Sequence, residues 1–313
     1  MSVALTIPQA CRNMFQDGLE HEAQQLQSRF RECARVKTGC TGKSQAHRIK
    51  RKVEMRDATG RLQKTVGEEQ SLEHRYIFGR KAYLATLIDE DDAMDLDWAF
   101  GPTGEEQMDH VSAAGRKVDD IFISGILGNN YEGTEESIAT VALPAAQIIA
   151  VNYRRDGLTA NQGLTLAKLI RAKGRFGKQE VYGQDAQQEG AKLWMAVGQD
   201  ELDNLLYEVE QTGSSDYNKV KALVDGEVNY FMGVHFKRTE RLPYTEPGGG
   251  KIIRSCPMWV STGVYMDFWY DVKTSIDVLP TQSQAIQVYS RLKVGAGRKR
   301  EEYVVNVLCE QDA

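Results

Sequence analysis

The chain has 313 residues, 41% of them hydrophobic and 27% charged, which suits one large folded domain or two small ones. It carries 39 Lys and Arg against 44 Asp and Glu, a net charge of −5. Proteins that grip nucleic acid usually have a basic face or a high pI. A protein of this balance that meets DNA is therefore better suited to containing it than to holding it.

The sequence carries no recognisable targeting or membrane segment. Its start lacks the basic residues and the uninterrupted apolar stretch of a signal peptide. The longest central run without charge ends at Arg154, and it contains Pro144 and polar residues that do not suit a transmembrane span. We therefore expect a protein made in the cytosol, without a membrane partner.

The cysteines are odd in number, widely scattered and free of any CxxC pair, so they do not form the close pairs of a structural zinc site. We expect reduced thiols, although bridges to another chain stay open. The five are Cys11, Cys33, Cys40, Cys256 and Cys309.

Residues 1–45 predict a polar arm, because only Phe15, Leu19, Leu26 and Phe30 give apolar spacing there. Such a segment needs a neighbour to order it.

Residues 46–75 predict a long basic hairpin, with a turn at Asp57–Arg61 and a return over 62–66. Its apolar content is too low for a core of its own. Since an isolated two-stranded ribbon is marginally stable in water, we expect it to lie on another surface.

Charge is segregated along the first third of the chain. Residues 29–64 hold twelve Lys and Arg against three acids, whereas nine acids and no Lys or Arg lie between Leu84 and Gly115. The two segments can pair within or between subunits. They can equally be two solvated faces, since exposed ion pairs contribute only about 0–1 kcal/mol each.

The strongest local signal is a helix that begins after Pro102. Thr103 and Glu106 have the spacing of a capping box, and Gly128 with Asn129 ends the helix. About 24 residues at 1.5 Å each give a rod on the order of 36 Å. Apolar and small residues repeat at spacings of three and four on one face. They are Met108, Val111, Gly115, Val118, Phe122 and Gly125.

Residues 130–255 predict a mixed α/β segment. One helix starts at Leu164 and stops near Gly174, a second covers 202–209 and a third covers 217–224. Alternating apolar residues then predict a single half-buried strand over 228–236, and 247–251 reads as an exposed loop.

Residues 256–309 are rich in strand pattern. The alternation over 286–294, the glycines of Gly295–Arg298 and the alternation over 305–309 predict a C-terminal hairpin that turns at those glycines.

The motifs of catalysis and cofactor binding are missing. The GKS sequence at 42–44 resembles a phosphate loop, but Lys37 stands where that loop requires glycine. The acidic run at 89–97 lacks the aligned glycine and glutamate of a calcium loop. No nucleophile, general base or metal motif is present. We expect no catalytic residue, no cofactor and no metal.

The order of these features is similar to that of the major capsid proteins of tailed bacteriophages. The most specific stretches are Leu87–Asp97, Ala113–Gly128, Ser214–Pro243 and Gly295–Cys309, and the resemblance covers about residues 75–310. It implies the Hong Kong 97-type fold, an α+β fold with an N-terminal arm, an extended β-hairpin loop, a peripheral domain with a long spine helix, and an axial α/β domain.

The resemblance also implies a division of the chain. The arm is 1–45, the extended loop 46–75, the peripheral domain 76–139 with 251–313, and the axial domain 140–250. Thr103, Glu106, Met108, Val111, Val118 and Phe122 match the spine helix. Expected inter-subunit contacts are Arg48, Lys50, Arg51, Lys52, Arg56, Arg61, Lys64, Asp89, Asp91, Asp92, Asp95, Asp97, Glu105 and Glu106.

The implied function is non-enzymatic self-assembly. Hexamers and pentamers would build an icosahedral shell around double-stranded DNA, bound without sequence specificity, in a virion assembled in the host cytoplasm. Since no long extension precedes the arm, we expect a separate scaffolding protein, together with a portal and, as an open point, a decoration protein. The alternatives are a nanocompartment (encapsulin-like) shell around an enzyme cargo and a cytosolic enzyme with a metal site at Asp91, Asp92 and Asp95.

Overall fold

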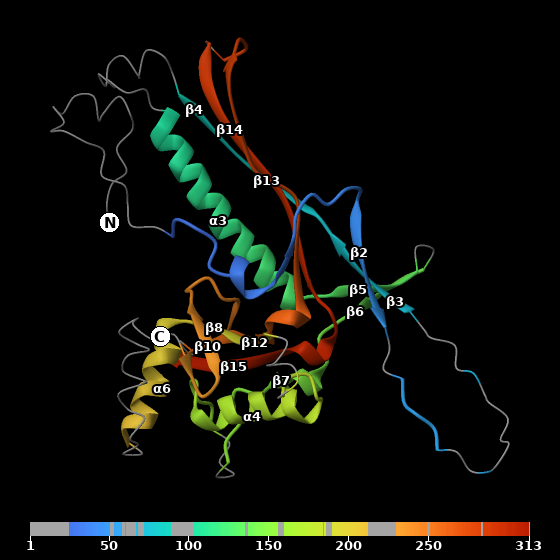
Figure 1. Ribbon diagram of the computed structural model, residues 1–313. Helices are drawn as coiled ribbons and strands as arrows, with labels where there is room; N and C mark the ends of the chain where they lie inside the picture. Colours follow the sequence, from blue (N-terminus) through green and yellow to red (C-terminus); the bar gives the residue numbers. More distant parts are fainter. Residues whose placement is uncertain are drawn as a thin grey trace.

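The computed structural model describes residues 25–50, 53–57, 60, 67, 72–88, 103–134, 137–155, 160–183, 185, 190–211, 230–248, 251–282 and 284–312. Within these ranges the fold is mixed α+β, with three sheets and long helices beside them (Figure 1).

The tall sheet has the strand order β1-β13-β14-β4 and rises beside a long helix (Figure 1). Its long strands, β13 and β14, form one antiparallel hairpin that is continued by β4. Its strands are β1 (Arg35–Lys37), β13 (Val264–Leu279), β14 (Ala285–Arg298) and β4 (Arg80–Ile88).

The body sheet has the order β7-β15-β12-β8-β10-β9, with β11 paired to β12. Its strands are β7 (Ile148–Ile149), β15 (Val304–Asp312), β12 (Lys251–Val260), β8 (Leu193–Val197), β10 (Val234–Arg238), β9 (Tyr230–Phe231) and β11 (Tyr244–Gly248). Two helices, α4 (Leu166–Lys178) and α6 (Gln199–Gln211), pack beside it. The segment 251–313, assigned from the sequence to the peripheral domain, thus shares a sheet with strands of 140–250, and the domain division stays a prediction.

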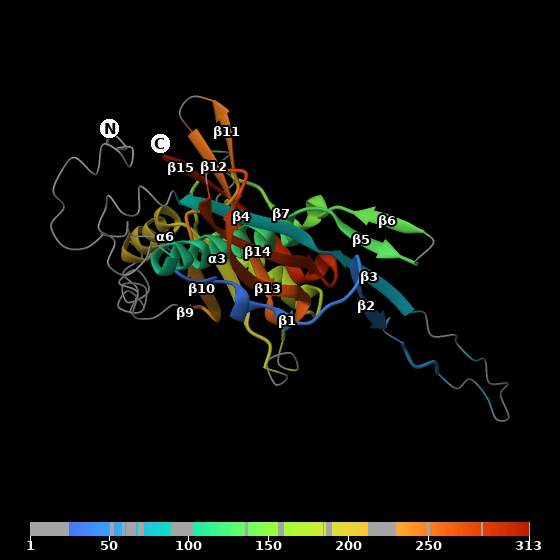
Figure 2. The ribbon, with the colours of Figure 1, turned by 90° about the horizontal axis from the view of Figure 1, so that it is seen from above.

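The loop sheet has the order β2-β3-β5-β6 and projects from the body (Figures 1 and 2). Its strands are β2 (Ser44–Lys50), β3 (Leu72–Phe78), β5 (Asn130–Gly133) and β6 (Ile138–Val141). Lys50 pairs opposite Leu72, so the predicted hairpin exists at its base. The predicted return strand over 62–66 lies outside the described residues.

The predicted long helix is confirmed as α3 (Thr103–Leu127). Of the apolar stripe, Val118 and Phe122 are buried, whereas Met108 and Val111 are 62% and 48% exposed, so only the later part of the stripe lies in the core. The first half of α3 instead turns His110 toward the tall sheet, where Thr86 and Ser290 hydrogen-bond to its ring.

Around Trp259 of β12, the core brings together aromatic side chains from the predicted arm, from α3 and from the body sheet. The rings of Phe30 and Phe122 stack at 5.5 Å, and both lie edge-on to Trp259, whose indole N–H donates to the Cys33 carbonyl. Phe30 belongs to the predicted arm. Residues 25–45 are therefore ordered by their own subunit, with one turn of 3₁₀ helix at Arg31–Cys33, and not only by a neighbouring one.

The predicted C-terminal hairpin was wrong. β14 continues straight through Gly295 and Gly297, and β15 lies in the body sheet. These glycines allow close approach: a side chain at Gly295 would meet the Phe78 carbonyl oxygen at 2.7 Å, and one at Gly297 would meet Asn130 at 2.6 Å. The chain passes from β14 of the tall sheet to β15 of the body sheet through the 3₁₀ turn Glu301–Tyr303.

The single strand predicted over 228–236 was also wrong in its described part. β9 and β10 are antiparallel and are joined by a two-residue turn at Met232 and Gly233, with φ of 52° and 81°. Positive φ at both turn positions is the geometry of a type I′ hairpin.

The three helices predicted within residues 130–255 have different outcomes. The one over 202–209 is confirmed within α6. α4 runs past Gly174, its expected stop, to Lys178, because Phe176 is fully buried and holds the last turn. The third helix, over 217–224, lies outside the described residues.

Candidate assembly interface

The base of the basic hairpin presents two of the predicted contact residues to solvent. Along β2, Arg48 and Lys50 are exposed and Ile49 between them is buried, because successive side chains of a strand point to opposite faces. Arg56, beyond the strand, is exposed too. The other predicted basic contacts, Arg51, Lys52, Arg61 and Lys64, lie outside the described residues.

Apolar side chains accompany these charges on the loop. Val53 is 62% and Met55 103% exposed, and Leu72 at the start of β3 is exposed as well. A soluble monomer gains nothing from holding large apolar side chains in water. Their exposure is typical of a surface that another chain covers.

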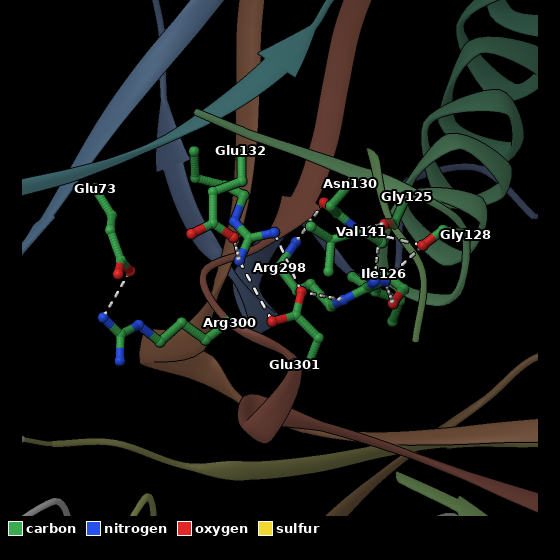
Figure 3. Close-up of polar contacts among 11 residues, drawn as sticks. Glu73, Gly125, Ile126, Gly128, Asn130, Glu132, Val141, Arg298, Arg300 and Glu301 are labelled. Atoms are coloured by element: carbon green, nitrogen blue, oxygen red, sulfur yellow. Dashed lines mark hydrogen bonds and ion pairs between the residues drawn. The ribbon is translucent and has the colours of Figure 1, made fainter. Parts of the chain in front are cut away.

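The loop sheet is fixed to the rest of the subunit by a buried polar junction (Figure 3). Arg75 of β3, only 2% exposed, lies within 3.1 Å of Glu301 and 3.2 Å of Glu132. Arg300 and Glu73 form a second pair at 2.9 Å. Removing the carboxylate partners of a buried arginine costs several kcal/mol of folding free energy. The junction therefore resists rotation of the loop sheet against the rest of the subunit.

Arg298 extends the junction to the end of α3 (Figure 3). It is fully buried and donates to the carbonyl oxygens of Ile126, Gly128 and Val141. The last carbonyls of a helix have no partner within the helix. Arg298 thus caps α3 and ties it to β6.

A second contact links the loop sheet to the tall sheet. The Nε2 atom of His47 in β2 lies 2.7 Å from Asp267, which is fully buried in β13, and the His47 ring stacks on Tyr265 at 4.0 Å. Together with the junction, this contact fixes the direction in which the loop leaves the subunit.

None of these junction residues was predicted as a functional residue. Buried charged groups leave no periodic signal in a sequence, and Arg75 and Arg298 look like surface residues until their carboxylate and carbonyl partners are located. The density of charge in Arg298–Glu302 was the available hint.

The structure does not test the predicted acidic contacts. Asp89, Asp91, Asp92, Asp95 and Asp97 lie outside the described residues. Thr103, Glu105 and Glu106 are in the first turn of α3, but their side chains lie outside the description, so the capping box and the contact roles remain predictions.

The described residues offer no other chemistry of note. They contain no group of three His, Cys, Asp or Glu placed to hold a metal ion. Cys33, Cys40, Cys256 and Cys309 are buried free thiols, and burial raises the pKa of Cys33 to about 12. No helix in the described ranges has both the length and the apolar character to span a membrane.

Comparisons with known proteins agree with one another. A family model described as phage capsid protein matches residues 7–311. The search of curated proteins found no match. Among solved structures, the capsid of cyanophage P-SCSP1u has a TM-score of 0.66 at 14% identity, covering 96% of this chain and 93% of that one.

Two further capsids extend this likeness to the whole chain. The Ralstonia phage GP4 capsid has a TM-score of 0.65 at 10% identity and covers 100% and 99% of the two chains. The acid-stable capsid of the Helicobacter pylori bacteriophage KHP30 has a TM-score of 0.66 at 8% identity and covers 99% of each. The fold is thus the Hong Kong 97-type capsid fold that the sequence predicted.

Proposed function

The chain belongs to the phage capsid protein family and is a major capsid shell protein, and we propose that its copies form the hexamers and pentamers of an icosahedral shell around double-stranded DNA. The observation that carries the proposal is the loop sheet. It is rigidly attached to the subunit, yet it carries exposed Val53, Met55 and Leu72 away from the core.

A closed ring of identical subunits needs a heterologous contact, in which one patch docks on a different patch of the neighbour. The loop sheet suits this role because large apolar side chains at its end, Val53, Met55 and Leu72, are exposed in the described part of the subunit. Obligate interfaces often exceed roughly 2,000 Å², and a projecting loop adds contact area without enlarging the core.

The protein is a component of the virion. We further propose that it assembles in the host cytoplasm with a separate scaffolding protein and a portal, with a decoration protein as an optional partner. Its role is structural, and we propose that it catalyses no reaction. A net charge of −5 agrees with a wall that encloses DNA without gripping it through counterion release.

The alternative of a nanocompartment shell around an enzyme cargo is not favoured, since the family model and the similar structures are those of phage capsids. Electron microscopy of the purified protein, with its contents identified, tests the choice. Empty or DNA-filled icosahedral particles support the proposal, whereas enzyme-filled cages contradict it.

Deletion of residues 51–64 tests the role of the loop. Seven residues would still join Lys50 to Leu72, which are paired neighbours in the sheet, so the subunit should fold normally. We expect a soluble chain with an unchanged far-UV spectrum that sediments as small species and forms no shells. Normal particles from the shortened chain would contradict the assigned role.

A further inference from the structure

The tall sheet has one face that α3 leaves uncovered. Thr86 of β4 and Ser290 of β14 both hydrogen-bond to His110 of α3, so the even-numbered side chains of these strands point toward the helix. The odd-numbered ones therefore point the other way. Tyr83 on that side is 76% exposed.

Basic and aromatic residues gather on this face. Tyr83 pairs with Arg291 in register and stacks on Tyr289 at 6.1 Å. Lys273 and Arg291 both lie over the ring of Tyr270, at 5.4 and 5.7 Å, which places the three on one side of the sheet. Lys81, Tyr83, Tyr270, Lys273, Tyr289 and Arg291 make up what we call the basic-aromatic face.

The tyrosine rings on this face already have neighbours on the sheet. Tyr270 is flanked by two cations, and Tyr83 by Tyr289. These partners take up part of the ring area on which nucleic-acid bases would stack. Exposed cations fixed over a flat sheet suit an acidic polypeptide segment better.

The chain itself supplies such a segment. The acidic tract, residues 89–97, holds six carboxylates, and no Lys or Arg occurs between Leu84 and Gly115. We propose that the basic-aromatic face of one subunit receives the acidic tract of a second copy. The proposal rests on the shell function proposed above, since it supplies the second copy.

The ends of the tract favour contact between copies over contact within one. The tract leaves Ile88 at the end of β4 and leads to Thr103 at the start of α3, and α3 covers the opposite face of the sheet. The helix that the tract leads into therefore lies on the side of the sheet opposite the basic-aromatic face. Tract and face are two different patches, as a heterologous ring contact requires.

Charge reversal with mixing tests the proposal. The face-reversed variant carries Lys81→Glu and Arg291→Glu, and the tract-reversed variant carries Asp91→Lys and Asp92→Lys. The control carries Lys178→Glu and Lys192→Glu, two exposed lysines that belong to neither the basic-aromatic face nor the acidic tract. We expect the control to form shells like the wild type and each reversed variant to lose at least tenfold in shell yield.

An equal mixture of the two reversed variants should restore assembly into six-membered rings, because the variants can alternate there and each face then meets an oppositely charged tract on the other protein. A five-membered ring keeps one like-charged contact. If the mixture fails to assemble and only a single chain carrying all four substitutions regains assembly, the contact lies within one subunit and the proposal is wrong. The proposal is also wrong if the face-reversed variant forms shells in normal yield. This holds even if those shells retain less nucleic acid than wild-type shells.

A second measurement does not depend on shells. A labelled peptide of residues 86–99, titrated onto the full-length chain, should bind the wild type and the control in a salt-sensitive manner and the face-reversed variant at least tenfold more weakly. If the wild type binds the peptide but never forms shells, the shell function fails while the contact stands. Equal binding by all three proteins refutes the contact.

Discussion

The guanidinium of Arg298 donates a hydrogen bond of 2.6 Å to the carbonyl oxygen of Gly128, the residue that follows the last turn of α3. The same side chain reaches the Ile126 carbonyl at 3.0 Å and the Nε atom lies 3.5 Å from Glu301. One buried cation thus completes the helix end and balances a carboxylate of the junction. The length of α3 and the direction of the loop sheet depend on the same residue.

Replacing Arg298 with Met should lower the free energy of unfolding by about 3–5 kcal/mol, because three buried carbonyls lose their donor and Glu301 keeps only Arg75 as a cationic partner. Chemical denaturation of the subunit measures the loss. Arg300→Met is the matched control: its partner Glu73 lies on the partly exposed side of the junction, so we expect a loss of about 1 kcal/mol or less. Equal losses would show that the capping role is not special.

The sequence predicted local elements better than their partners. The 25-residue helix α3 and the strands later found as β14 and β15 carry strong periodic signals, so their existence could be read directly. Which sheet each strand joins is a long-range property. Gly295 and Gly297 have the composition of a turn, and only the nearby Phe78 and Asn130 reveal that they serve close packing.

The candidate interface also divides into local features that the sequence indicates and long-range ones that it does not. Arg48 and Lys50 were predicted as contacts from the basic hairpin and the capsid resemblance, and both are exposed. The basic-aromatic face escaped prediction, because its residues come from three strands separated by some 200 positions and meet only through strand pairing. The stripe on α3 was read correctly at Val118 and Phe122. The stripe continues to the exposed Met108 and Val111, since the spacing predicts a face of the helix but not the length over which that face is buried.

Asp119 anchors the arm to α3. Its carboxylate is 1% exposed and accepts hydrogen bonds from the Ser28 hydroxyl at 2.6 Å and from the Arg29 amide at 3.0 Å. Asp119→Ala should cost about 3 kcal/mol of unfolding free energy, because these buried donors lose a charged acceptor. It should also make residues 25–45 the first site of limited proteolysis.

The neighbouring residue provides the control for that experiment. Asp120 pairs with the exposed side chain of Arg241 at 2.6 Å. We expect Asp120→Ala to change stability by about 1 kcal/mol or less and to leave the cleavage pattern unchanged. If both variants release the arm equally, the anchoring role of Asp119 is refuted.

Two helical glycines should respond in opposite directions to alanine. A side chain at Gly125 in α3 would lie 2.5 Å from the Ala296 carbonyl oxygen, whereas nothing lies within 4 Å of one at Gly174 in α4. Gly174→Ala should therefore stabilise by up to about 1 kcal/mol through helix propensity. Gly125→Ala should destabilise by about 1–3 kcal/mol, because α3 must move away from β14. Thermal unfolding of both variants decides, and stabilisation by Gly125→Ala would contradict the close approach.

Two carboxylates around Arg254 should give the subunit opposing pH dependences. Burial raises the pKa of Glu201, which is fully buried, and the Arg254 guanidinium at 3.9 Å offsets only part of this. Burial also acts on Glu240, but hydrogen bonds from Arg254 at 2.5 Å and from the Gln199 amide at 2.8 Å prevail and lower the pKa of Glu240.

The signs follow from proton binding. A raised folded pKa means that the folded state holds the proton of Glu201 more tightly, so its contribution to stability is greatest below pH about 4.5 and is lost as the pH rises through the folded pKa. For Glu240 the lowered pKa gives stability that is present above pH about 4.5 and is lost as the pH falls through the folded pKa. Glutamine titrates at neither position.

As the pH is raised from about 3 to about 7, the free energy of unfolding relative to the wild type should therefore rise for Glu201→Gln, mainly above pH about 4.5, and fall for Glu240→Gln, mainly below pH about 4.5. Denaturant titrations across this range measure both slopes. The slopes are informative even if glutamine adds a constant penalty by disturbing the Gly198 and Gln311 contacts of Glu201. Slopes of the same sign in the two variants would show that Arg254 does not divide its charge between these carboxylates as the geometry indicates.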